Sequence, residues 1–81
     1  MGVSKNEFRG YVYNEIRKMK QDYIELTSGD IHREIGGYPD KNHNMPSCCD
    51  AMRELMIEGD TVVQEPEKGK GASLTIRYFK R

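Results

Sequence analysis

Apolar side chains recur at helical spacing in the first quarter of the chain. Phe8, Val12, Ile16, Met19 and Tyr23 are separated by steps of 4, 4, 3 and 4 positions. This spacing is typical of a helix that buries one face. The pattern predicts a helix over residues 5–20, followed by a connector or a short strand at residues 22–26.

A second helix is predicted to begin at Thr27, where helix-starting residues gather. Thr27 can act as the N-cap, and Asp30, three residues later, can reach back to it as in a capping box. Ile31 and Ile35 then form an apolar pair one turn apart. Gly36 ends this helix, because glycine is the preferred residue just past a helix C-terminus.

The third helix is predicted to begin near Asn44 or Met45, with Pro46 in its first turn, and to end at Gly59. Successive side chains of a helix are 100° apart, so this segment divides into two sides. The apolar side carries Met45, Cys48, Cys49, Met52, Leu55 and Met56. The opposite side carries Ser47, Asp50, Arg53, Glu54 and Ile57.

Two β-rich segments follow the third helix. Residues 61–65 and 72–80 are rich in β-branched and aromatic side chains. Pro66 and the run Lys-Gly-Lys-Gly at residues 68–71 separate them, and such residues mark a turn. These segments predict a C-terminal antiparallel hairpin.

Length and composition indicate one small globular domain of the α+β class spanning residues 1–81. The chain has 81 residues, of which 36% are hydrophobic. No apolar run approaches the roughly 20 residues of a membrane span, and the first residues lack the apolar core of a signal peptide. We therefore expect a cytoplasmic protein without membrane contact, whose two cysteines stay reduced.

Charge is balanced overall but unevenly distributed. The chain carries 13 basic and 13 acidic residues, and its pI is about 6.7. Such balance weighs against DNA binding, for which a basic domain is the usual footprint. Residues 1–22 and 61–81 each have five basic groups and only three and two acidic groups, whereas the middle of the chain is acidic. A local basic face can still attract a polyanion.

The order of the elements, helix, helix, helix and hairpin, resembles the winged helix-turn-helix superfamily. The likeness rests on residues 26–36, residues 52–60 and the Gly-Lys-Gly hairpin tip at residues 69–71. Residues 43–56 and 71–78 are also similar to small uncharacterised bacterial and phage proteins. The resemblance implies a small winged helix with about three helices, in which the C-terminal hairpin is the wing.

The resemblance also implies a function. Members of the superfamily commonly place the third helix in the major groove of double-stranded DNA, with the wing on the backbone or minor groove. We therefore expect a DNA-binding regulatory or accessory module of transcription, acting as a monomer or homodimer. The residues implied at the DNA interface are Ser47, Asp50, Ala51, Arg53, Glu54, Lys68, Lys70 and Arg77.

Two features depart from the superfamily pattern. The loop from Gly36 to Asn44 is longer than the turn of a tight helix-turn-helix. Asp50, Glu54 and Glu58 also step by four along the polar side of the third helix, where carboxylates would repel phosphates. The alternative is a protein–protein adaptor that uses this acidic face as its interface.

Two further nucleic-acid contacts follow from the residues themselves. The glycines beside Lys68 and Lys70 allow close approach of the backbone to phosphate, and the ammonium groups add charge-assisted contacts. The same tip also reads as a charged turn that keeps a strand edge from aggregating. Phe79 beside Arg77 and Lys80 matches a stacking platform for single strands, although packing of an edge strand against the first helix explains it as well.

Neither a metal site nor an enzyme is expected. His32, His43, Cys48 and Cys49 include no Cys-x-x-Cys or His-x-x-x-His pair, and adjacent helical cysteines point about 100° apart. We therefore predict no metal or other cofactor, and assign Cys48 and Cys49 to the core. A Cys48 nucleophile beside His43 would need a lowered pKa, which its apolar side of the helix opposes.

Overall fold

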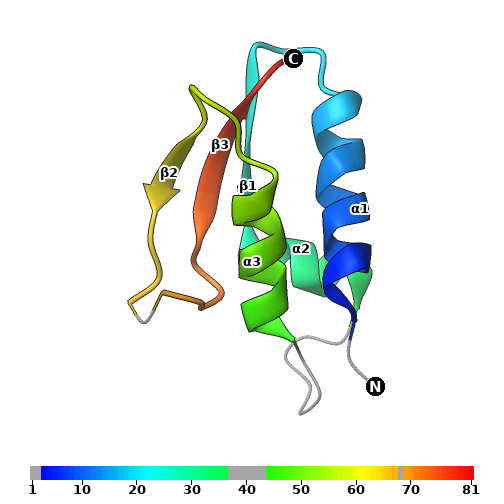
Figure 1. Ribbon diagram of the computed structural model, residues 1–81, viewed down its shortest axis with the longest axis vertical. Helices are drawn as coiled ribbons and strands as arrows, with labels where there is room; N and C mark the ends of the chain where they lie inside the picture. The colour runs from blue at the N-terminus through cyan, green and yellow to red at the C-terminus, as the bar shows by residue number, and fades with distance from the viewer. Residues whose placement is uncertain (1–2, 37–43, 68) are drawn as a thin grey trace.

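The computed structural model describes residues 3–36, 44–67 and 69–81. These residues form three helices and one antiparallel sheet of three strands, in the spatial order β1-β3-β2. Helices α1 and α3 cover one side of the sheet, and α2 lies at the end of β1 (Figure 1). The elements are α1 (Lys5–Arg17), β1 (Tyr23–Thr27), α2 (Ser28–Ile35), α3 (Met45–Glu54), β2 (Thr61–Gln64) and β3 (Thr75–Phe79).

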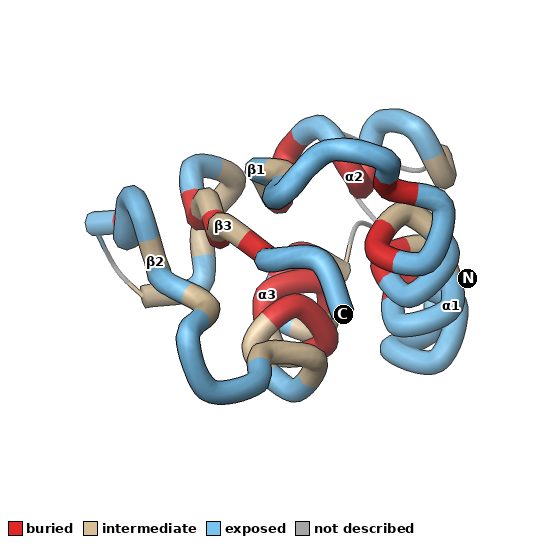
Figure 2. Tube along the Cα trace, turned by 90° about the horizontal axis from the view of Figure 1, so that it is seen from above, coloured by how far each residue is buried: buried red, intermediate tan, exposed pale blue. Residues whose placement is uncertain are grey.

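Helix α1 buries the face that its apolar spacing predicts. Phe8, Val12 and Ile16 are all in the core, while the outer side of the helix is exposed (Figure 2). A capping box starts the helix: the Ser4 hydroxyl accepts from the Glu7 N–H at 3.3 Å, and the Glu7 carboxylate accepts from the Ser4 N–H. The helix ends at residue 17 rather than 20, because the chain must turn within five residues to enter β1.

The segment at residues 22–26, predicted as a connector or short strand, is largely β1. Thr27 ends this strand and is also the N-cap of α2, but its side chain makes no capping bond. Its hydroxyl instead lies 2.9 Å from the hydroxyl of Thr75, its cross-strand partner. Asp30 forms an ion pair with Arg33 rather than reaching back to Thr27. The predicted capping box is therefore wrong, because the Thr27 hydroxyl bonds to its cross-strand partner Thr75 and not to the backbone of α2.

Helix α3 is shorter than predicted, since it ends at Glu54 instead of continuing to Gly59. A turn built around Asp60 follows. The Asp60 carboxylate accepts from the N–H groups of Ile57 and Phe79, both at 2.9 Å, and binds Arg81. These bonds tie the start of β2 to the end of β3, so the chain must leave the helix early.

The predicted hairpin is confirmed, but it lies within a larger sheet. β3 pairs with β2 on one side and with β1 on the other, which makes it the central strand rather than an edge strand. Ile76 and Tyr78 of β3 point into the core with no exposed surface. The Tyr78 hydroxyl donates to the backbone oxygen of Met52 at 2.7 Å, which joins the sheet to α3.

The α+β class predicted from the sequence is thus confirmed, with three helices and a three-stranded antiparallel sheet among the described residues. Cys48, Cys49 and Met52 are completely buried, as their side of the third helix predicts. Throughout the ranges that the structure covers, the helices are too short and too polar to cross a bilayer.

Candidate nucleic-acid interface

The outer side of α3 and the segment that connects β2 to β3 form one surface. Burial of Cys48, Cys49 and Met52 leaves the opposite side of α3 facing outward. Ser47, Asp50 and Arg53 step by three along that side and are all partly exposed. Ala51 does not join them, because it is fully buried against the core. Its predicted place in a DNA groove is therefore wrong.

Opposite charges pair across this surface. The Lys70 ammonium lies 3.2 Å from the Asp50 carboxylate, and the Arg53 guanidinium lies 3.7 Å from the Glu65 carboxylate. Each pair joins α3 to the segment between β2 and β3, and each lies at the solvent boundary. We call Ser47, Asp50, Arg53 and Lys70 the α3–hairpin surface. These four predicted interface residues thus lie on one surface, but each of its two cations already has a carboxylate partner.

Arg77, another predicted DNA contact, is not on the α3–hairpin surface. Arg77 lies on the outer face of the sheet, with its guanidinium 2.7 Å from Glu25 and 4.8 Å from the centre of the Tyr23 ring. Side chains alternate between the two faces of β3. Because Ile76 and Tyr78 point into the core, Arg77 between them lies on the outer face. Lys68 lies outside the described residues.

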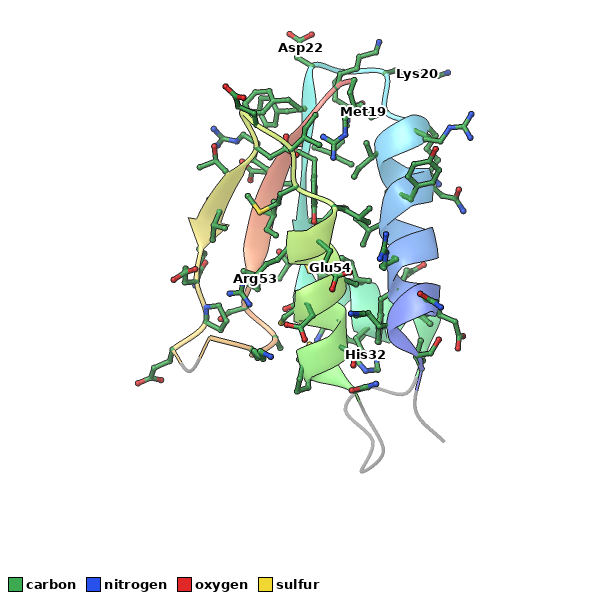
Figure 3. All side chains as sticks on the ribbon, viewed as in Figure 1. Met19, Lys20, Asp22, His32, Arg53 and Glu54 are labelled. Carbon is green, nitrogen blue, oxygen red and sulfur yellow. The ribbon has the colours of Figure 1, made fainter. Side chains whose placement is uncertain are left out.

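The acidic stripe predicted along the third helix is not continuous. Glu54 turns toward α1, where its carboxylate binds Lys5 at 2.7 Å and Arg9 at 3.0 Å. In Figure 3, Arg53 and Glu54 accordingly leave α3 in different directions. The hydrogen bond from Lys5, with Arg9 beside it, holds the pKa of the Glu54 carboxyl below its usual value. Glu58 follows the end of the helix, so the predicted spacing does not place it on that face.

His32 has a structural role between two helices. Its ring is fully buried and packs edge-on against Phe8, with centroids 4.8 Å apart. Nε2 accepts from the Asn44 N–H at 2.9 Å, and Nδ1 lies 3.1 Å from the Gly36 oxygen. This pattern fits the tautomer with its proton on Nδ1, and it links the end of α2 to the start of α3.

No metal centre forms where the chain is described. In these residues, no group of three or more His, Cys, Asp or Glu side chains is placed to hold an ion. His43, the other histidine considered as a ligand, lies outside them. The Cys48 thiol lies 3.6 Å from the Ser28 oxygen, and the Cys49 thiol lies 3.3 Å from the Gly71 oxygen, so both face backbone.

The two thiols are poor nucleophiles. Burial, with Cys49 alongside, raises the pKa of Cys48 to about 12. Burial also raises the pKa of Cys49 above its ordinary value. Because the thiolate is the reactive form, this environment opposes nucleophilic catalysis at neutral pH.

These raised pKa values predict a loss of stability in alkali. Thiols of the unfolded chain lose their protons above about pH 8.5, while the buried native thiols keep theirs. The unfolded state then binds fewer protons, so the free energy of unfolding falls as pH rises. We expect a lower urea midpoint near pH 10 than near pH 7. A C48A/C49A variant should show a shallower decline, and an equal decline in both proteins would contradict the assignment.

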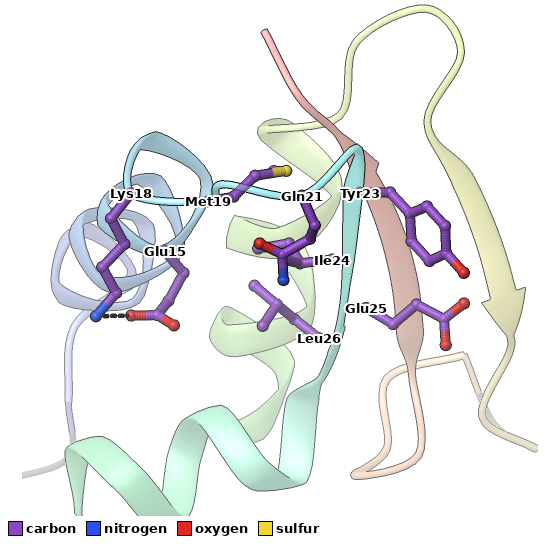
Figure 4. Close-up of a pocket in the computed structure, with 8 residues that line it drawn as sticks. All are labelled: Glu15, Lys18, Met19, Gln21, Tyr23, Ile24, Glu25 and Leu26. Carbon is purple, nitrogen blue, oxygen red and sulfur yellow. Dashed lines mark ion pairs between the residues drawn. The ribbon is translucent and has the colours of Figure 1, made fainter.

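A shallow groove of about 530 Å³ runs along β1 beside the end of α1 (Figure 4). Its apolar wall consists of Met19, Ile24 and Leu26. Its polar rim includes Glu15 and Lys18, which form an ion pair at 2.7 Å. Its lining includes no serine, cysteine or histidine.

Sequence reasoning missed the partners that set the charge of the α3–hairpin surface. Glu65 and Asp50 compensate its two cations, and only Asp50 had been considered. The available signal was weak: Glu65 is the last residue of the segment 61–65 that was predicted as the first strand of the hairpin. Comparisons with protein-family models, curated proteins and solved structures found no significant match to this chain.

Proposed function

We propose that this chain is a winged-helix domain that binds double-stranded DNA through the α3–hairpin surface. The support is the element order α–β–α–α–β–β together with the sheet order β1-β3-β2. This arrangement sets the outward side of α3 directly beside the hairpin, as a helix entering a groove next to a wing would require. The hydroxyl of Ser47 and the cations of Arg53 and Lys70 are the groups available to DNA there.

The ion pairs of this surface are compatible with phosphate binding. Exposed ion pairs contribute only about 0–1 kcal/mol, so a phosphate can replace a carboxylate as partner at little cost. Lys70 would then leave Asp50 for the backbone, while Arg53 could reach a base edge, where arginine recognises guanine. Asp50 remains beside them and opposes the approach of phosphate. DNA affinity is therefore expected to be modest and strongly dependent on salt.

Removal of Lys70 is the direct test. Lys70→Ala should weaken binding to all duplexes alike and reduce the log–log salt slope by about 0.9, which corresponds to one phosphate contact. Fluorescence anisotropy with mixed duplex DNA at two salt concentrations measures both quantities. Lys20→Ala is the matched control, because Lys20 is an exposed cation at the opposite end of the molecule (Figure 3). Absence of binding by the unaltered protein at low salt would refute the proposal.

Two further variants distinguish DNA from a protein partner. Asp50→Asn should increase DNA affinity severalfold, because it frees Lys70 and removes a negative charge from the surface. Arg53→Ala should alter the preference between sequences rather than affinity for all of them. An adaptor that used acidic groups of the third helix would instead lose its partner on Asp50→Asn and would give no shift with duplex DNA.

A further inference from the structure

Helix α1 carries a second regular stripe, on its outer side. Asn6, Gly10, Tyr13 and Arg17 step by 4, 3 and 4 positions, the spacing of residues on one helix face. Because Phe8, Val12 and Ile16 occupy the buried face, this stripe is free to contact something outside the domain. Tyr13 is 50% exposed, although it is a large aromatic residue.

The stripe borders a groove between α1 and the end of α3. One hollow, of about 430 Å³, is lined by Asn6, Arg9, Gly10, Tyr13 and Leu55. A second hollow, of about 440 Å³, is lined by Tyr13, Ile16, Arg17, Leu55, Ile57 and Arg81, together with Glu54. The two hollows are adjacent, because Tyr13 and Leu55 line both of them, and we call them together the α1–α3 groove. Ile57, which lines the second hollow, is 52% exposed.

Gly10 is not explained by packing within the domain. Glycine inside a helix costs about 1 kcal/mol relative to alanine. A Cβ built at Gly10 would meet no atom within 4 Å, apart from its chain neighbours and its own helix backbone. The fold therefore leaves room for a side chain there, yet the position is bare. A missing side chain in a helix face allows another backbone to approach closely.

The charges of the α1–α3 groove are predominantly positive. Arg9, Arg17 and Arg81 line it, and Glu54 is the one acidic residue of its lining. Arg81 already binds the Asp60 carboxylate, at 2.9 Å. Glu54 is already compensated by Lys5 and Arg9. Arg17 lies 5.7 Å from the centre of the Tyr13 ring and has no carboxylate partner within residues 3–36, 44–67 and 69–81. A ligand with carboxylates beside an apolar strip would match the charge of Arg17.

We propose that the α1–α3 groove binds an amphipathic helix of a partner protein, with apolar residues on one side and flanking carboxylates. Apolar side chains would occupy the hollows over Leu55 and Ile57, as a helix does in a hydrophobic groove. The partner backbone would cross α1 at Gly10, and its carboxylates would meet Arg17. A second copy of this chain is a poor occupant, because a symmetric contact would oppose arginine to arginine.

This proposal is independent of DNA binding, since the groove and the α3–hairpin surface use different residues. The probe is a synthetic helical peptide of about 16 residues, with leucines at i, i+3, i+4 and i+7 and glutamates elsewhere. Its companion carries lysine at every glutamate position. NMR titration of the labelled protein should show saturable shifts at Gly10, Tyr13 and Ile57 with the acidic peptide. Affinity for the basic companion should be at least about tenfold lower.

Three variants test the geometry. Tyr13→Ala should weaken binding of the acidic peptide by about tenfold or more, as expected for a central aromatic contact. Tyr23→Ala, which alters a similarly exposed tyrosine on the outer face of the sheet, should leave binding unchanged. Gly10→Leu should reduce binding by about tenfold because its side chain blocks the crossing point. Gly10→Ala should raise the melting temperature by about 2–8 °C, which shows that the position tolerates a side chain.

The proposal is overturned if the acidic peptide does not saturate, if both peptides bind equally, or if the shifts map elsewhere. It is also overturned if Gly10→Leu folds normally and binds as the unaltered protein does. Concentration-dependent shifts at the same residues without peptide, with a dimer in sedimentation, would identify a second copy as the occupant instead.

Discussion

Met52→Ala is expected to lower the free energy of unfolding by about 2–5 kcal/mol. Met52 has no exposed surface, and its backbone oxygen accepts the hydrogen bond from Tyr78 that joins α3 to the sheet. Truncation leaves a cavity at this junction, and the close-packed surroundings can fill it only in part. A loss of this size approaches the whole stability of many small domains. Urea denaturation followed by circular dichroism measures it.

Leu55→Ala is the matched comparison. The sequence pattern places Leu55 with Met52 on the apolar side of the predicted third helix, where truncation of either side chain would cause a similar loss. Leu55 instead follows the end of α3 and is partly exposed in the α1–α3 groove, so we expect a smaller effect, below about 1.5 kcal/mol. Met52→Leu, which conserves volume, should retain most of the stability. An unchanged urea midpoint for Met52→Ala would mean that α3 is rotated about its axis.

Gly29→Ala is expected to destabilise the protein by about 1–3 kcal/mol, although it enlarges the side chain by one methyl group only. A Cβ at this position would lie 2.8 Å from the backbone oxygen of Ala72 and 3.1 Å from its Cβ. The Gly29 N–H also donates to that same oxygen at 2.9 Å. The carbonyl therefore cannot move away without weakening the hydrogen bond that holds it.

Gly10→Ala is the control for this prediction, because the same change is made in a helix with open space around it. The two substitutions should shift the thermal midpoint in opposite directions: Gly29→Ala downward and Gly10→Ala upward. A rise for Gly29→Ala would show that α2 and the hairpin are not in close contact. The contact also bears on the proposed DNA-binding surface, because Ser28 and Cys49 donate to the backbone oxygen of Gly71, next to Lys70. Gly29→Ala is accordingly expected to weaken DNA binding as well.

The helices and strands were largely predictable from local patterns. The buried face of α1, the start of α3 near Pro46 and the β2–β3 hairpin all follow from apolar spacing and turn residues. These signals are local, because they arise from residues within a turn or two of one another. The ends of α1 and α3 were not predictable in this way. Each depends on where the chain must go next, and at α3 on the Asp60 bonds to Ile57 and Phe79.

For the candidate interface, too, the sequence predicts part of the arrangement and the tertiary contacts decide the rest. The outward positions of Ser47, Asp50 and Arg53 follow from helical periodicity, so the sequence by itself determined which side of α3 is available. Only the tertiary structure decided what meets these residues: Lys70 at Asp50 and Glu65 at Arg53. It also decided that Glu54 faces α1 and that Arg77 lies on the outer face of the sheet. Charge pairing depends on distances between segments far apart in the chain, which no local pattern records.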